Sequence, residues 1–523
     1  MYDILIKNGT IIDGTGAPMY KADIGIKEDK IAKIGNLQDE KWEIEIDATD
    51  KLVCPGFIDV NNHSDAYWQI FANPNLESLV YQGITTIVVG NCGSSLAPLA
   101  DAGTLASIQK WSNISKVNLN WLTMEEFLRV IEDKKLSVNF ATLVGHGTLR
   151  RGILNDQMRS PNQKEMAFIK KMLAGALEEG ALGMSSGLVY THARTASAEE
   201  LIELCAIIRK YGGVYVTHIR GEGADFLEAV EEAIKIGEEA KVKLHISHLK
   251  VMGEKNWHLM DEALFLIGKA KERGVDVTFD VYPYTNTGTV LYTLLPKWVA
   301  DGGKKIMLSR LKDPAIRGKI IKEMRESDFD YSKIDIAISS LDKTLVKRSI
   351  REIAAAQGKA VEDSILDILA ASEGRVITSM EVLSQENVEK LIRHPLSIIA
   401  SNGSGYDIAH GKTGELVHPR SFGAFTKILA KYVLQKKTLS WEEAIRKMTL
   451  LPAEKFGIEQ RGKIAEKYFA DIAIIDRDAV NDPATVSNPY QYSKGIDIVL
   501  VNGQLVVSEG RYTGIRNGEI IKK

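Results

Sequence analysis

The sequence predicts an α/β fold in three parts: a (β/α)8 TIM barrel, a small β-sandwich domain built from both chain ends, and an inserted subdomain. Three observations support this prediction. Apolar strands alternate with helical stretches through the middle of the chain, hairpin patterns occupy both ends, and a long charged segment precedes the last strand. We expect residues 1–54 and 435–523 to form the sandwich, and residues 55–434 to form the barrel with an insertion at about 288–395.

The two chain ends share a pattern of short β-rich runs and turns that differs from the pattern of the middle. Residues 2–53 alternate short β-rich runs with Asn-Gly, Asp-Gly and Gly-Asn turns, and "GKIAEKYFADIAIID" and "DIVLVNGQLVVSEGRY" repeat that style near the other end. One sandwich assembled from both termini explains the pattern, and two separate edge hairpins explain it nearly as well.

The barrel prediction is based on eight apolar segments with helical stretches between most of them. Helical spacing of apolar residues and a glycine near the stop are clear in "QKEMAFIKKMLAGALEEG" and "FLEAVEEAIKIGEEA". Alternation of this kind favours a closed parallel barrel over an open sheet. The eight segments are residues 57–60, 84–90, 138–145, 181–186, 214–219, 243–248, 277–283 and 396–401.

Composition narrows the function classes. Of the 523 residues 45% are hydrophobic and 26% charged, and the net charge of -3 makes nucleic acid an unexpected partner. No apolar run is long enough to span a bilayer, and the start "MYDILIKNGT" lacks the apolar core of a signal peptide. Three cysteines argue against a disulfide framework and for a reducing compartment, so we expect a cytoplasmic protein. The sequence leaves the oligomeric state open.

Metal-binding residue types gather where the predicted strands end, which is where barrels of this kind carry out chemistry. Five of the eight strand-end positions are His or Cys, although the chain holds only ten His and three Cys. The eight positions are His63, Cys92, His146, Ser186, His218, His248, Tyr282 and Asn402.

Three of these residues form a plausible zinc site. Cys92 lies between glycines in "VVGNCGSSLAP", and His218 and His248 end consecutive strands. A thiolate with two neutral imidazoles suits zinc and leaves a fourth position for water or substrate. Cys92 could instead be a small buried apolar residue. His245 faces the other side of its strand and is taken as structural, while His146 could equally cap a loop.

Eight motifs in this order and spacing make the chain resemble one family over essentially its full length. They are "PGFIDVNNHSD", "GNCGSSLAP", "GHGTLR", "GALGMSSGLVY", "YVTHIR", "ISHLK", "DVYPYT" and "HPRSFGAF". Together they resemble the N-acyl-D-amino-acid deacylase (D-aminoacylase) branch of the amidohydrolase superfamily. The resemblance implies a metal-dependent barrel that hydrolyses the amide of N-acyl-D-amino acids with zinc as cofactor.

The same resemblance assigns roles to individual residues. Cys92, His218 and His248 match the ligands of the tightly bound zinc. The family's His-x-His falls on Asn61 and His63, so its first histidine is absent.

Further matches concern catalysis and the substrate. The catalytic aspartate of the family falls on Asn402, whose amide has no basic site at neutral pH. Lys250, Tyr282 and Arg420 match positions that would hold the substrate carboxylate.

The two asparagines both replace groups of the second, weaker metal position, so we expect one tightly bound zinc ion. Another residue must then take the proton from the attacking water. His63 is our candidate, although it could remain a metal ligand or a structural residue. Asp65, Glu222, Asp407 and Glu415 are less favoured alternatives.

The predicted function is therefore hydrolysis of a C–N (amide) bond in an N-acyl amino acid or related small amide, with a small-molecule substrate that carries a carboxylate. A catalytically silent relative that binds a small carboxylate ligand or a partner is the alternative. A third reading makes Cys92 a nucleophile paired with a histidine.

Overall fold

Eight parallel strands form the centre of the computed structural model, which describes residues 1–101, 103–104, 120–155, 157–326, 330–339 and 341–523. They pair in the orders β10-β9-β8 and β11-β12-β13-β14-β15-β19, and β11 continues β10 after Leu143. The strands are β8 (Phe57–Asp59), β9 (Ile84–Val89), β10 (Asn139–Thr142), β11 (Val144–Gly145), β12 (Gly183–Gly187), β13 (Val214–His218), β14 (Lys243–Ile246), β15 (Val277–Val281) and β19 (Ser397–Ile399).

Hydrogen bonds between the ends of β8 and β19 close the ring. The backbone N–H of Ser401 donates to Asp59 Oδ1 at 2.9 Å, and its hydroxyl donates to the other carboxylate oxygen. The backbone N–H of His63 donates to the carbonyl of Gly403 at 2.7 Å. Closure therefore places the loop that carries His63 beside the loop that carries Asn402.

Apolar side chains fill the barrel, as strands buried on both faces require. Ala453 and Phe456 of α17 (Leu450–Phe456) join this interior core. Other members lie on the barrel strands or next to their ends, and include Ile58, Val60, Val88, Ala141, Leu143, Leu182, Val214, Val216, Ile398 and Ala400. Every predicted strand segment overlaps an observed strand, so the α/β barrel prediction is confirmed.

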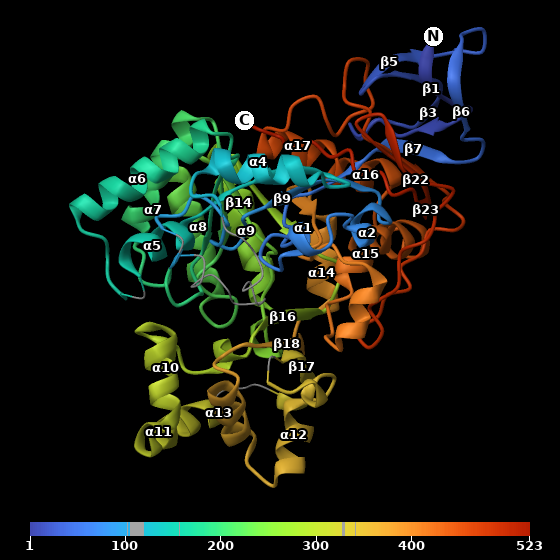
Figure 1. Ribbon diagram of the computed structural model, residues 1–523. Coiled ribbons are helices and arrows are strands. Elements are labelled where there is room, and N and C mark those ends of the chain that lie inside the picture. The colour runs from blue at the N-terminus through green and yellow to red at the C-terminus, as the bar shows by residue number, and fades with distance from the viewer. Residues whose placement is uncertain (102, 105–119, 156, 327–329, 340) are drawn as a thin grey trace.

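Helices surround the barrel (Figure 1). The two helices expected from apolar spacing are present as α6 (Gln163–Glu178), which starts at a capping box of Asn162 and Glu165, and α8 (Phe226–Ala240). The other helices of this layer are α1 (Gln69–Ala72), α2 (Glu77–Val80), α4 (Met124–Lys134), α5 (His146–Leu154), α7 (Ala198–Lys210), α9 (Leu259–Glu272), α14 (Gln385–Arg393), α15 (Arg420–Lys427), the π-helix η7 (Ile428–Gln435) and α16 (Trp441–Met448).

An insertion between β15 and α14 forms a subdomain at the bottom of Figure 1. Its antiparallel sheet has the order β16-β18-β17, and it has an apolar core of its own. Its elements are β16 (Asn286–Val290), η2 (Leu291–Leu294), η3 (Lys297–Ala300), α10 (Gly303–Lys312), α11 (Pro314–Arg325), η4 (Tyr331–Lys333), β17 (Ile334–Ser339), η5 (Lys343–Leu345), α12 (Ile350–Gln357), α13 (Val361–Ala371) and β18 (Val376–Glu381).

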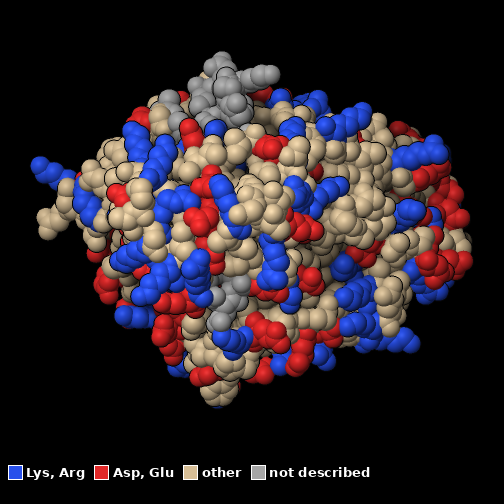
Figure 2. Space-filling view, turned by 90° about the horizontal axis from the view of Figure 1, so that it is seen from below, with Lys and Arg blue, Asp and Glu red and all other residues tan. Residues whose placement is uncertain are grey.

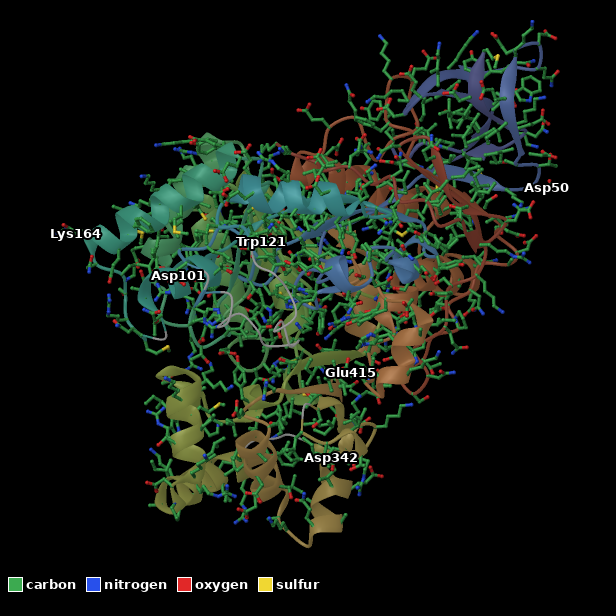
Figure 3. The ribbon with its side chains drawn as sticks, in the orientation of Figure 1. Asp50, Asp101, Trp121, Lys164, Asp342 and Glu415 are labelled. Atoms are coloured by element: carbon green, nitrogen blue, oxygen red, sulfur yellow. The ribbon has the colours of Figure 1, made fainter. Side chains whose placement is uncertain are left out.

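The loop after β19 connects barrel and insertion. Figure 3 shows Glu415 of this loop where the two parts meet. The next residue, Leu416, donates its backbone N–H to the carbonyl of Ala337 on β17 at 2.9 Å. The insertion is thus attached to the loop that follows Asn402.

Two further sheets share an apolar core; one is built from N-terminal strands, and the other combines strands from both chain ends. One sheet has the order β5-β4-β1-β6, and the other has the order β23-β22-β21-β20-β7-β2-β3. The boundaries between this sandwich and the barrel stay a prediction. The strands are β1 (Tyr2–Lys7), β2 (Thr10–Ile11), β3 (Tyr20–Lys21), β4 (Asp23–Lys27), β5 (Lys30–Gly35), β6 (Trp42–Asp47), β7 (Leu52–Pro55), β20 (Ile472–Ile475), β21 (Ile496–Val501), β22 (Gln504–Ser508) and β23 (Arg511–Tyr512).

The surface carries mixed charge. Figure 2 shows Lys and Arg interspersed with Asp and Glu on the face that is seen from below. Within the described ranges, no helix combines the length and apolar character that crossing a membrane requires. The cytoplasmic location stays a prediction.

Candidate metal centre

A pocket of about 1020 Å³, including its open mouth, lies at the carboxyl ends of the barrel strands. Part of its wall comes from β16, η2 and β18 of the insertion. Its lining residues are His63, Ala66, Tyr67, Asn91, Cys92, Ser94, Val189, Tyr190, His218, Glu222, His248, Lys250, Met252, Thr287, Gly288, Thr289, Thr293, Leu294, Met380, Asn402 and Arg420.

The loop after β9 directs Cys92 into this pocket, and its backbone has positive φ angles at two successive residues. Cys92 has φ 52°, and Gly93 has φ 77°. A Cβ on Gly93 would lie 2.7 Å from the backbone nitrogen of Gly187, so a side chain does not fit there. The amide of Asn91 donates to the carbonyl of Val88 at 2.9 Å and holds the start of the turn.

His218 and His248 bring two imidazoles to the same point. His218 is the last residue of β13, and His248 follows β14 with φ 36°. Their ring centroids lie 4.4 Å apart, and Cys92 Sγ lies 3.5 Å from His248 Nε2. One potential ligand atom from each of the three residues lies within 4.8 Å of the others.

This donor set fits zinc. A thiol and two imidazoles are borderline-soft donors that zinc prefers, and three protein ligands leave a fourth position open. Burial, followed by the neighbouring Lys250 and His218, holds the pKa of His248 well below its ordinary value of 6.5. The imidazole is therefore neutral at neutral pH, which is the form that binds a metal.

Asp280 on β15 organises the floor of the site. Its carboxylate accepts the backbone N–H of His248 at 2.9 Å and His245 Nε2 at 3.0 Å. Asn61 Nδ2 donates to both carboxylate oxygens at 3.2 Å, and among the described residues its buried Oδ1 has no hydrogen-bond partner. His245 also contacts Thr278 Oγ1 at 2.8 Å, as expected for a structural residue.

His63 and Asn402 face each other across the barrel closure. His63 Nε2 lies 2.8 Å from Asn402 Oδ1, and Asn402 has φ 48°. Burial, followed by the Arg420 guanidinium, lowers the pKa of His63 to about 4, against the opposing effects of Asn402 and Asp280. The His63 imidazole is therefore neutral at neutral pH.

Arg420 brings a buried positive charge to the pocket. Its Nε and Nη1 atoms have no hydrogen-bond partner in the described part of the chain, and its guanidinium lies 5.0 Å from the centre of the Tyr282 ring. Tyr282 itself does not line the pocket in the described structure, although its buried hydroxyl has no partner there. An unpaired buried guanidinium is well suited to a carboxylate ligand.

Lys250, predicted as a second carboxylate ligand, already has a partner. Its ammonium donates to Glu222 Oε1 and lies 3.1 Å from His248 Nδ1. Both residues line the pocket, so Glu222 introduces a negative charge beside the imidazoles.

The remaining strand-end residues lie outside the described pocket lining. His146 Nε2 contacts Glu200 Oε1 on α7 at 2.9 Å, and Ser186 Oγ contacts Tyr215 Oη at 2.8 Å. Three acidic residues that were considered as alternative proton acceptors, Asp65, Asp407 and Glu415, also lie outside the lining. Asp407 caps η6 (Ile408–Thr413), and Glu415 contacts His410 at 3.0 Å.

A family model described as the amidohydrolase family matches residues 45–507 of the chain. That range covers all of the barrel, the insertion and part of the sandwich. The chain belongs to the amidohydrolase family.

Curated relatives place this amidohydrolase near one branch of the family. It is 33% identical to D-aminoacylase of Alcaligenes xylosoxydans xylosoxydans over 522 residues, which is 100% of this chain and 98% of the relative. It is also 33% identical to N-acyl-D-glutamate deacylase of the same organism over 521 residues, covering 100% and 96% of the two chains.

Solved structures agree with these matches. A D-aminoacylase structure described with a binuclear metal centre, one-metal activation and second-metal attenuation is 31% identical, with a TM-score of 0.85 and full coverage of both chains. N-acyl-D-glutamate deacylase from Bordetella bronchiseptica, complexed with zinc and a phosphonate inhibitor, is 31% identical with a TM-score of 0.84 and full coverage of both chains. The predicted resemblance to the D-aminoacylase branch is confirmed, and the roles of individual residues stay predictions.

Sequence reasoning missed part of the amidohydrolase site. Asp280 had one visible signal, an acidic residue inside the otherwise apolar strand "VTFDVYP". Thr287, Leu294 and Met380 of the insertion had none, because their contribution depends on how the insertion folds back over the barrel.

Substitution of Cys92 tests the proposed ligand set. Cys92→Ala should reduce the zinc retained by purified protein from about one equivalent to less than about a tenth, because an alanine offers no ligand atom. Metal analysis after dialysis against a chelator measures the change. Cys205→Ala on α7 is the control, since Cys205 is also a buried cysteine outside any disulfide but is not part of the cluster. A Cys92→Ala protein that keeps a full equivalent would contradict the proposed ligand set.

Proposed function

We propose that this amidohydrolase cleaves the amide bond of N-acyl amino acids, or of related small amides with one carboxylate, using one zinc ion held by Cys92, His218 and His248. The observation that carries the proposal is the convergence of one thiol and two imidazoles within 4.8 Å, in a pocket that Arg420 also lines. The full-length similarity to D-aminoacylase supports it.

The retained donor set supplies the chemistry that amide hydrolysis needs. When bound, zinc polarises an amide carbonyl and lowers the pKa of water toward neutrality. Cys92, His218 and His248 would hold the ion, and the pocket would bring the scissile amide to them. The insertion wall would limit the access of bulk water to this point.

Asn61 and Asn402 support a single ion. Asn61 directs its amide nitrogen to Asp280, and the side chain of Asn402 contacts His63. Neither amide offers the imidazole or the carboxylate that the family's second metal position uses. Two altered groups at one position, with all three ligands of the other kept, fit the loss of that position alone.

His63 is the proposed proton acceptor. It lines the pocket, and its neutral imidazole has one ring nitrogen beyond the Nε2 that contacts Asn402. A neutral imidazole can take a proton from water, which the Asn402 amide cannot do. His63 would then act as the general base, with Asn402 fixing its orientation.

Arg420 is the proposed carboxylate ligand. Of the described pocket residues, Lys250 and Arg420 are the cationic side chains, and Lys250 is already paired with Glu222. One cation therefore remains for the substrate. This favours substrates with a single carboxylate over N-acyl-glutamate or N-acyl-aspartate, whose second carboxylate would have no cation.

A catalytically silent relative remains the second candidate function. Asn402 favours it, because an amide stands where the family has its catalytic aspartate. Such a protein would use Arg420 and the pocket to bind a small carboxylate ligand without turnover.

Turnover of N-acyl-D- and N-acyl-L-amino acids by zinc-loaded protein tests the proposal. We expect hydrolysis of a neutral N-acyl amino acid, and Arg420→Met should raise its KM by about 10- to 100-fold through loss of a charged hydrogen bond. The same acyl amide without the carboxylate is the control, and its kinetics should not respond to the substitution. If every N-acyl amino acid tested binds but none is cleaved, the second candidate function, binding without turnover, is correct.

His63→Ala tests the proton acceptor. The variant should lower kcat by about 10²- to 10⁴-fold and keep its zinc, because general base catalysis contributes that much and the ion has its three ligands. Steady-state kinetics together with metal analysis measures both effects. His410→Ala, a histidine outside the described pocket lining, should leave kcat unchanged. Full turnover in zinc-loaded His63→Ala would eliminate the role.

The double variant Asn61→His with Asn402→Asp tests the single-ion assignment. It restores an imidazole and a carboxylate at the second position, so its metal content should rise from about one to about two equivalents. The single variants serve as controls and should hold fewer than two. Wild-type protein that already binds two equivalents would contradict the assignment.

A further inference from the structure

Glu222 lies beside both imidazoles of the metal cluster, and it has no role in the proposed catalysis. One of its carboxylate oxygens, Oε1, lies 3.4 Å from His218 Nε2 and 3.4 Å from His248 Nδ1. The ammonium of Lys250 donates to the same oxygen. Glu222 is buried, so this carboxylate must be satisfied by these neighbours.

Each imidazole brings one ring nitrogen to 3.4 Å from this carboxylate. His248 directs Nε2 toward Cys92 Sγ at 3.5 Å, and its other ring nitrogen faces Glu222. His218 faces Glu222 with Nε2, which leaves Nδ1 as its ligand atom. Each ring can therefore bind a metal with one nitrogen and donate to Glu222 with the other.

Proton positions make Glu222 the acceptor. A metal on His248 Nε2 requires the ring proton on Nδ1, which contacts both Lys250 and Glu222. Lys250 is itself a donor, so of these two groups only Glu222 can accept that N–H. The same reasoning applies to His218, whose Nε2 would carry the proton.

We propose that Glu222 is the positioning residue of the metal centre, where one carboxylate fixes the tautomer and orientation of both ligating imidazoles. Lys250 is the counter-ion that compensates the charge of this carboxylate. The inference rests on the metal centre of the proposed function. Carboxylates behind ligating histidines tune metal affinity in this way.

Zinc affinity measured without substrate tests the inference. Glu222→Gln should weaken zinc binding by about 10- to 100-fold in competition with a chromophoric chelator, because a neutral amide is a poorer acceptor for two imidazole N–H groups. The matched control is Glu232→Gln on α8, which loses an ion pair with Arg220 at 2.7 Å but touches neither imidazole. Unchanged affinity in Glu222→Gln, or an equal loss in Glu232→Gln, would overturn the proposal.

The visible absorption spectrum of bound cobalt(II) distinguishes a changed ligand geometry from a general loss of stability. In the cobalt-substituted protein, Glu222→Gln should shift the visible absorption bands, since reoriented imidazoles change the ligand field, and Glu232→Gln should not. An unshifted spectrum overturns the inference. If Glu222→Gln does not fold, Glu222→Asp replaces it, because retracting the carboxylate by one methylene should cause the same losses.

The outcomes also separate this inference from the proposed function. Wild-type protein that binds no zinc would overturn the metal centre and both proposals together. Wild-type protein that binds zinc but cleaves no substrate would overturn the hydrolase proposal, while the affinity comparison between the Glu222 and Glu232 variants would still decide the role of Glu222.

Discussion

The arrangement of the site depends on the buried carboxylate of Asp280. A carboxylate removed from water must be paired or fully hydrogen-bonded, and Asp280 accepts from Asn61, His245 and the backbone of His248. Asn61 follows the first strand, His245 belongs to the sixth, His248 follows the sixth, and Asp280 lies on the seventh. The requirement to satisfy one charge therefore fixes the strand ends around the metal centre relative to each other. Leaving a buried polar group without one of its hydrogen-bond partners costs about 1–3 kcal/mol in other proteins.

Three residues near Asp280 have a strained backbone conformation. Cys92, His248 and Asn402 all have positive φ, at 52°, 36° and 48°, although none of them is a glycine. A non-glycine residue in that region costs about 1–3 kcal/mol and persists only where its surroundings enforce it. At His248, the hydrogen bond from its backbone N–H to Asp280 helps to hold this conformation. The strain turns three side chains at the ends of different strands toward one pocket.

The two asparagines change the charge balance of the site. Without a carboxylate at residue 402, the described negative group among the pocket residues is Glu222, and Lys250 compensates it. In the proposed function, a dication held by one thiolate and two neutral imidazoles would lie next to this neutral pair rather than next to a free acid. That balance suits one ion, and it leaves the Arg420 guanidinium as the group that attracts an anionic ligand.

The sequence by itself determined the barrel and singled out the three residues of the candidate metal cluster. Strand and helix periodicity is a local property, and in a parallel barrel the carboxyl ends of the strands lie at one end, so Cys92, His218 and His248 could be grouped before their distances were known. Only the tertiary structure decided how the side chains pair. Lys250 turned to Glu222, Asn61 to Asp280 and His146 to Glu200, because buried hydrogen bonds depend on distances between residues far apart in the chain. Which residues of the insertion line the pocket was likewise beyond sequence reasoning, since contact between two separately packed parts leaves no periodic pattern in either.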